Sequence, residues 1–128
     1  MIEELVRAGY AAFNRGDYDA AASYYHPRVE LHRPGGLTPL VGSDALRAWM
    51  EPDAFSEQMI EPLSVEVGDG RLLIHQRMRA VAAGSGIEME NDTWCVMSYD
   101  DDLLLTRIVT FMLHEEQAAR EAAGLPVA

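Results

Sequence analysis

The sequence predicts an α+β domain in which helices come first and a mainly antiparallel sheet follows. Residues 2–14 place apolar side chains at the spacing of an amphipathic helix. Residues 87–97 instead alternate with a period of two, as a strand with one buried face does. Gly68-Asp69-Gly70 is a strong hairpin signal between two apolar runs. Helices followed by a meander of strands are typical of the α+β class.

The helical part is predicted in three pieces. Gly16 suits the end of the first helix and Asp17 suits the N-cap of the second. Residues 18–25 form the second helix, which we expect to end at Pro27. The third helix is residues 45–50, with a cap at Ser43 or Asp44 and a stop at Pro52. Before it we expect a short strand at 29–32 and a loop at 33–39. After it we expect a further helical turn holding Phe55 and Met59.

The second half is predicted as strands joined by short turns, with one closing helix. The expected strands are residues 63–67, 72–82, 87–99 and 103–113, with turns at 83–86 and 100–102. Residues 115–123 form a short helix, and Gly124 follows its end.

Length and charge limit what the chain can be. Its 128 residues fit one domain, residues 1–128, with one core. The net charge of −11 would repel a phosphate backbone and an anionic membrane surface, so neither nucleic acid nor membrane is an expected partner. The lone cysteine, Cys95, lies in an apolar stripe and is predicted to be a buried core residue. The first residues resemble neither a signal peptide nor a membrane span, so we expect a cytoplasmic protein.

The run at residues 87–97 poses the main functional question, because its acidic residues occupy one face. The four-residue turn at 83–86 pairs Ala82 with Ile87, which places Arg77 opposite Asp92. In this register the acids face arginines and water, and the other face of the strand is the core. A slip of one residue would turn Asp92 into the interior, so a buried carboxylate stays an alternative.

Three segments carry a family resemblance: residues 12–21 (AFNRGDYDAA), residues 24–32 (YYHPRVELH) and residues 42–46 (GSDAL). With the ending from Arg107 to Leu125, the chain resembles the SnoaL-like branch of the nuclear transport factor 2-like superfamily. The resemblance implies a strongly bent sheet wrapped on three helices, a cystatin-like α+β cone. It also implies a deep apolar pocket and a homodimer formed through the sheet. Family members include ketosteroid isomerases, polyketide cyclases, a dehydratase, epoxide hydrolases and many proteins without chemistry, so fold alone does not settle function.

The resemblance suggests three candidate catalytic residues. Isomerases and cyclases of the superfamily carry a pocket carboxylate on a late strand, and one alignment places Asp92 there. A second isomerase acid falls at Arg33 by ungapped counting, which cannot be a base, but His32 lies beside it. Tyr10 lies next to Gly9, the counted position of the tyrosine that binds an oxyanion in isomerases.

The predicted pocket wall combines apolar side chains with a few neutral hydrogen-bonding groups, as small-ligand sites do. The polar members are Gln76, Asn91 and Thr93. The apolar and aromatic members are Phe13, Tyr25, Trp49, Phe55, Met59, Met78, Met89, Met97, Phe111 and Met112. The four histidines lack zinc spacing, so neither a metal nor another cofactor is expected.

Three functional hypotheses follow. The first is a domain that binds a small, mostly apolar ligand without an established catalytic set. The second is a cofactor-independent cyclase, isomerase or dehydratase that uses Asp92 with His32 or Tyr10 for proton transfer. The third is a dimeric interaction module whose cavity is filled by Met78, Met89 and Met97.

Overall fold

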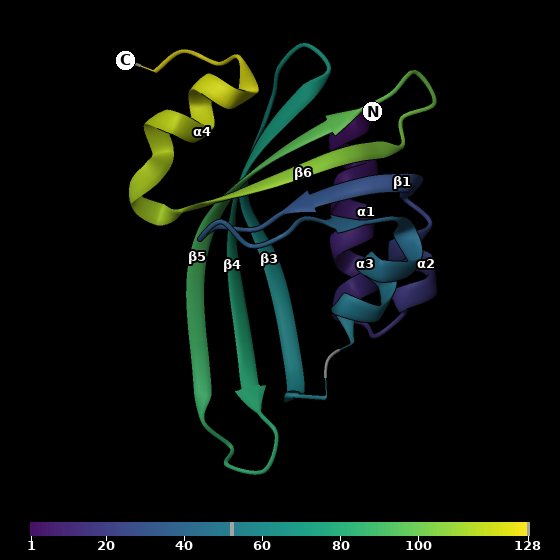
Figure 1. The fold of residues 1–128 in the computed structure, drawn as a ribbon, viewed down its shortest axis with the longest axis vertical. Helices are drawn as coiled ribbons and strands as arrows, with labels where there is room; N and C mark the ends of the chain where they lie inside the picture. Colours follow the sequence, from purple (N-terminus) through teal and green to yellow (C-terminus); the bar gives the residue numbers. More distant parts are fainter. Residues whose placement is uncertain (52, 128) are drawn as a thin grey trace.

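A computed structural model describes residues 1–51 and 53–127, which form a six-stranded sheet with helices on both faces (Figure 1). The strand order is β2-β1-β6-β5-β4-β3, and β1 and β6 are the one parallel pair among these neighbours. The strands are β1 (Tyr25–His32), β2 (Leu40–Val41), β3 (Phe55–Val67), β4 (Arg71–Ala82), β5 (Glu88–Tyr99) and β6 (Leu105–Met112). The α+β cone predicted from the sequence is confirmed.

The helices divide between the two faces of the sheet. The first three, α1 (Ile2–Asn14), α2 (Tyr18–Ala22) and α3 (Ser43–Met50), share the main core with Leu72, Ile74 and Cys95. We call this the concave face. On the convex face, α4 (Glu116–Ala123) follows a single 3-10 turn, Leu113–Glu115, and covers Leu73 and Trp94. No helix in the described part of the chain is long and apolar enough to cross a membrane.

Asn14 fastens the end of α1 to the edge strand β3. Its amide donates to the Ile60 carbonyl and its Oδ1 accepts from the Ile60 N–H, both at 2.8 Å. The side chain therefore pairs with the β3 backbone as another strand would, at an edge that would otherwise expose unpaired groups. Beyond this point β3, β4 and β5 continue as a long arm past the helices (Figure 1).

The hairpin register predicted from the turn at 83–86 is confirmed. Ala82 donates its N–H to the Ile87 carbonyl at 2.9 Å, and Arg77 and Arg79 lie opposite Asp92 and Glu90. The residues that alternate with these arginines and acids, such as Met78 and Ala80, therefore lie on the concave face.

Several predicted element boundaries are wrong. The second helix ends at Ala22 rather than at 25, and Pro27 lies inside β1, where the pairing with β6 is irregular and a missing N–H is tolerated. Phe55 and Met59 belong to β3 rather than to a helical turn, because that segment pairs with β4 along its length.

The start of α3 also differs from the prediction. The N-cap is Gly42, and neither Ser43 nor Asp44 caps the helix through its side chain. Gly42 donates its N–H to the Val29 carbonyl at 2.7 Å with a φ of 100°, a conformation that favours glycine. The helix ends at Met50; the predicted stop, Pro52, lies outside the described residues.

Candidate ligand cavity

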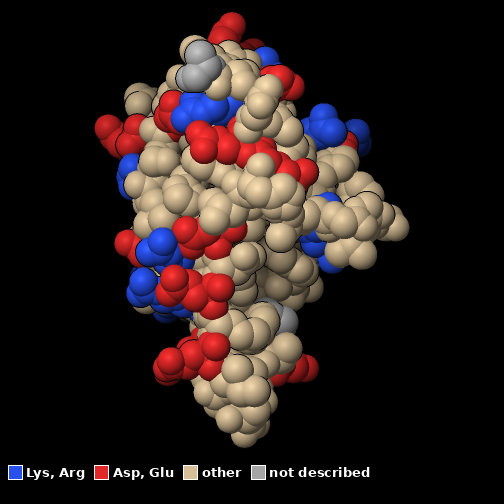
Figure 2. Space-filling view, turned by 90° about the vertical axis from the view of Figure 1, so that its left-hand side faces the viewer, with Lys and Arg blue, Asp and Glu red and all other residues tan. Residues whose placement is uncertain are grey.

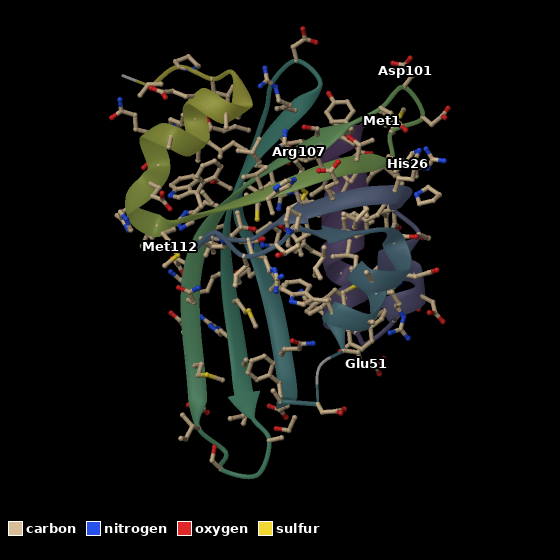
Figure 3. All side chains as sticks on the ribbon, in the orientation of Figure 1. Met1, His26, Glu51, Asp101, Arg107 and Met112 are labelled. Atoms are coloured by element: carbon tan, nitrogen blue, oxygen red, sulfur yellow. The ribbon has the colours of Figure 1, made fainter. Side chains whose placement is uncertain are left out.

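A small cavity of about 80 Å³ lies between α1, α3 and the concave face of the sheet. Most of its wall is apolar, with Val6 and Phe13 from α1, Leu46 from α3 and Ile108 from β6. Side chains fill much of the space between these helices and the sheet (Figure 3). The polar side chains that remain at the wall therefore decide what the cavity can recognise.

A chain of three hydrogen-bonding side chains begins at this wall with Tyr10 and Gln76 and ends at Thr93, which does not line the cavity. The Tyr10 hydroxyl lies 2.6 Å from Gln76 Oε1, and Gln76 Nε2 donates to Thr93 Oγ1 at 3.0 Å. Tyr10 comes from α1, whereas Gln76 and Thr93 are opposite each other on β4 and β5. The docking of α1 on the sheet therefore orients the Gln76 amide.

Two further titratable groups, Tyr25 and Cys95, line the cavity. Among the described residues, the Tyr25 hydroxyl has no hydrogen-bond partner in the protein, whereas the Cys95 thiol lies 3.6 Å from the Thr110 hydroxyl. Burial raises the pKa of both tyrosines, Tyr10 and Tyr25, and raises the pKa of Cys95 to about 11. All three groups are therefore protonated and neutral at pH 7.

A wider, open cleft of about 1080 Å³ lies beside the cavity, between the helices and the projecting arm. Phe13 lines both spaces, and its ring packs edge-on against Tyr18 at 5.5 Å between centroids. Phe55 and Met89 belong to the cleft wall, which also carries charged side chains. Phe13 is thus the shared boundary between the small cavity and the wider cleft.

The structure distributes the predicted pocket residues over several places. Phe13, Tyr25, Trp49, Gln76 and Met97 line the cavity together with Tyr10, whereas Phe55, Met59 and Met89 border the cleft. Of the three methionines in the filled-cavity hypothesis, Met97 lines the cavity and Met78 and Met89 do not. These side chains therefore leave the space open.

Other predicted pocket residues, Thr93 among them, lie outside both spaces. Met78 and Asn91 are opposite each other on the concave side of the arm, and Met112 lies at the end of β6, where the chain turns toward α4 (Figure 3). Phe111 was expected in the pocket but packs with Trp94 on the convex face. Both faces of β6 are apolar, so its pattern does not distinguish them.

Asp92 does not face the cavity. Arg77 binds it with two hydrogen bonds, at 2.8 and 3.1 Å, and His75 Nε2 lies 3.3 Å from its Oδ2. The hydrogen bonds from Arg77, and then His75, hold the pKa of Asp92 below its usual value. The pair is only partly solvated, because 15% of the Asp92 side chain and 32% of the Arg77 side chain are exposed. Asp92 is therefore an ionised partner of Arg77 on the convex face.

The convex face continues this pattern of paired charges. Arg79 lies 3.0 Å from Glu90, and His32 lies 2.9 Å from Glu30, outside the cavity. Basic and acidic groups lie next to one another on the side of the molecule shown in Figure 2. Of the three candidate catalytic residues, only Tyr10 reaches the cavity.

Cavity residues that the sequence reasoning missed include Leu5, Tyr24, Ile60 and Thr110. Thr110 shares its face with Cys95, so the strand alternation contained a usable signal for it. The described residues contain no group of three or more His, Cys, Asp or Glu side chains placed to hold a metal ion.

Helices on the concave side of a bent, unclosed sheet, with a small cavity between them, define the nuclear transport factor 2-like class. Within this class, residues 6–107 match the model of the SnoaL-like domain, and the chain belongs to that family. No curated protein matches the chain.

Solved structures share the fold at low sequence identity. A protein from Xanthomonas campestris pv. campestris that is proposed to be a polyketide cyclase is 20% identical, with a TM-score of 0.76 over 90% of this chain and 92% of that one. SalBIII, an epoxide hydrolase/cyclase-like enzyme in pyran ring formation in polyether salinomycin, is 17% identical, with a TM-score of 0.78 over 86% and 88%. TerC, co-crystallised with polyporic acid, is 18% identical, with a TM-score of 0.75 over 95% and 96%.

Proposed function

We propose that this SnoaL-like domain binds a small, mostly apolar ligand whose carbonyl oxygen accepts a hydrogen bond from Tyr25. The observation that carries the proposal is the Tyr25 hydroxyl, an unused donor at the wall of an apolar cavity. A hydrogen bond from such a free donor to a ligand carbonyl contributes about 0.5–1.5 kcal/mol.

The size of the cavity limits how much of the ligand enters. An engineered cavity of about 150 Å³ holds benzene, whereas this one measures about 80 Å³. The carbonyl head of the ligand therefore enters, and its apolar body lies against Phe13 at the border of the cleft.

The neutral state of the cavity favours binding over proton transfer. Because burial raises the pKa of Tyr10, Tyr25 and Cys95, these groups donate hydrogen bonds at pH 7 and do not act as bases. The positions of Asp92 and His32 on the convex face do not support the enzyme hypothesis that used them for proton transfer.

Acetophenone and ethylbenzene form a matched pair of probes for this proposal, because they differ mainly in the carbonyl. We expect NMR titration to show that acetophenone shifts resonances of the cavity residues and binds more tightly than ethylbenzene. Tyr25→Phe should weaken acetophenone binding about two- to tenfold and leave ethylbenzene unchanged.

Tyr99→Phe is the control, since Tyr99 packs against the same core but does not line the cavity. Equal affinity of the wild-type protein for both probes, or an unchanged preference in Tyr25→Phe, would contradict the proposed carbonyl contact.

A further inference from the structure

The direction of the hydrogen bonds in the Tyr10–Gln76–Thr93 chain decides what Tyr10 offers to a ligand. The distance of 2.6 Å between the Tyr10 hydroxyl and Gln76 is usual for an O–H donor and short for an N–H donor. Tyr10 therefore donates to Gln76 Oε1, and the Gln76 NH₂ group is left to donate to Thr93 at 3.0 Å.

This direction makes Tyr10 an acceptor toward the cavity. Its one proton is used within the protein, and the lone pairs of its oxygen remain. Tyr25 is instead a hydrogen-bond donor toward the cavity, because its proton has no partner among the described residues. Both phenols line the same cavity of about 80 Å³, so one small head group can reach both.

We infer that the ligand carries a carbonyl and a hydroxyl group on neighbouring carbon atoms. The carbonyl accepts from Tyr25, and the hydroxyl donates to Tyr10. Gln76 is the residue that determines this specificity, since it holds the Tyr10 proton and does not itself need to touch the ligand. The inference rests on the proposed function and adds a second polar contact to it.

α-Hydroxyacetophenone tests the inference, because it adds one hydroxyl group to acetophenone on the carbon next to the carbonyl. We expect the wild-type protein to bind it about two- to tenfold more tightly than acetophenone in the same NMR titration. Tyr10→Phe should remove this preference and leave acetophenone affinity unchanged. Tyr25→Phe should weaken both probes by the same factor and keep the preference.

Gln76→Met provides a second variant of similar shape. It releases the Tyr10 proton, so Tyr10 can also donate to a ketone oxygen; acetophenone should then bind more tightly, and the preference for the hydroxylated probe should fall. If the wild-type protein binds both ketones equally well, or if Tyr10→Phe and Gln76→Met both retain the preference, the inference is overturned and the proposed function stands. If neither ketone binds, the inference and the proposed function both fail.

Discussion

The two faces of the β4–β5 ladder carry different chemistry although they alternate along the same strands. The concave face presents a neutral hydrogen-bonding group, Gln76, to an apolar cavity, and Gln76 in turn donates to Thr93. The convex face presents charges that pair across the strands, such as Arg77 with Asp92. Charges are tolerated where water still reaches them, and neutral polar groups are suited to an enclosed space. The concave face is therefore the better candidate for ligand recognition.

The convex face is not uniform, because its end beneath α4 is as apolar as the concave core. Leu73 on the convex face and Ile74 on the concave face are adjacent in the chain, and both are 0% exposed. Leu73→Ala and Ile74→Ala should each lower the free energy of unfolding by about 2–5 kcal/mol, because each leaves a cavity in a packed layer. Urea denaturation measures both values. A loss below about 1 kcal/mol for Leu73→Ala alone would mean that α4 packs only loosely.

Titration of the concave face should lower stability at alkaline pH. The pKa of Cys95 is about 11 in the folded protein and 9.0 in its ordinary state. A raised pKa contributes stability that is present below pH 9 and is lost as the pH rises toward 11, on the order of 2 kcal/mol. Between pH 8.5 and 10, unfolding curves of Cys95→Ala should depend less on pH than those of the wild-type protein, while Tyr10 and Tyr25 contribute mainly above pH 10. Identical slopes would show that the thiol is not desolvated.

Titration of the convex face should lower stability at acid pH. Because Arg77 holds the pKa of Asp92 below 3.8, the ion pair contributes stability above about pH 3.8 that is lost as the pH falls through the lowered pKa. Asp92→Asn should flatten the dependence of unfolding free energy on pH below 4, measured by urea denaturation from pH 2 to 6. Asp101→Asn, in the exposed turn after β5, is the matched control. A curve for Asp92→Asn that follows the wild-type curve would remove Arg77 as the source of the lowered pKa.

The register of the two faces was predictable because a local signal determines it. The four-residue loop at 83–86 places the apolar residues of both strands on the same face of the sheet, and the pairing of Arg77 with Asp92 follows from this register. The family fold was also recognisable from its turn residues and packing residues.

The cavity itself was less predictable, because it depends on contacts between distant parts of the chain. Tyr10 and Gln76 are 66 residues apart, and only the docking of α1 on β4 brings them together. The helical turn expected at Phe55 was wrong for a similar reason, since pairing with β4 outweighs the local pattern. Phe111 lies on a strand that is apolar on both faces, and only the presence of α4 decides which side it packs against.

The smallest expected effect concerns charge pairs further out along the arm of the convex face. Arg79 and Glu90 are 3.0 Å apart, but 56% and 54% of their side chains are exposed. In a double-mutant cycle with Arg79→Ala and Glu90→Ala, we expect a coupling of about 0.2–1 kcal/mol, because water screens exposed pairs. The same cycle on Arg77 and Asp92, one row nearer to α4, should give a larger coupling, because Asp92 is only 15% exposed and accepts two hydrogen bonds. Equal coupling in the two rows would mean that solvent screens both pairs alike and that burial does not change the coupling energy along the convex face.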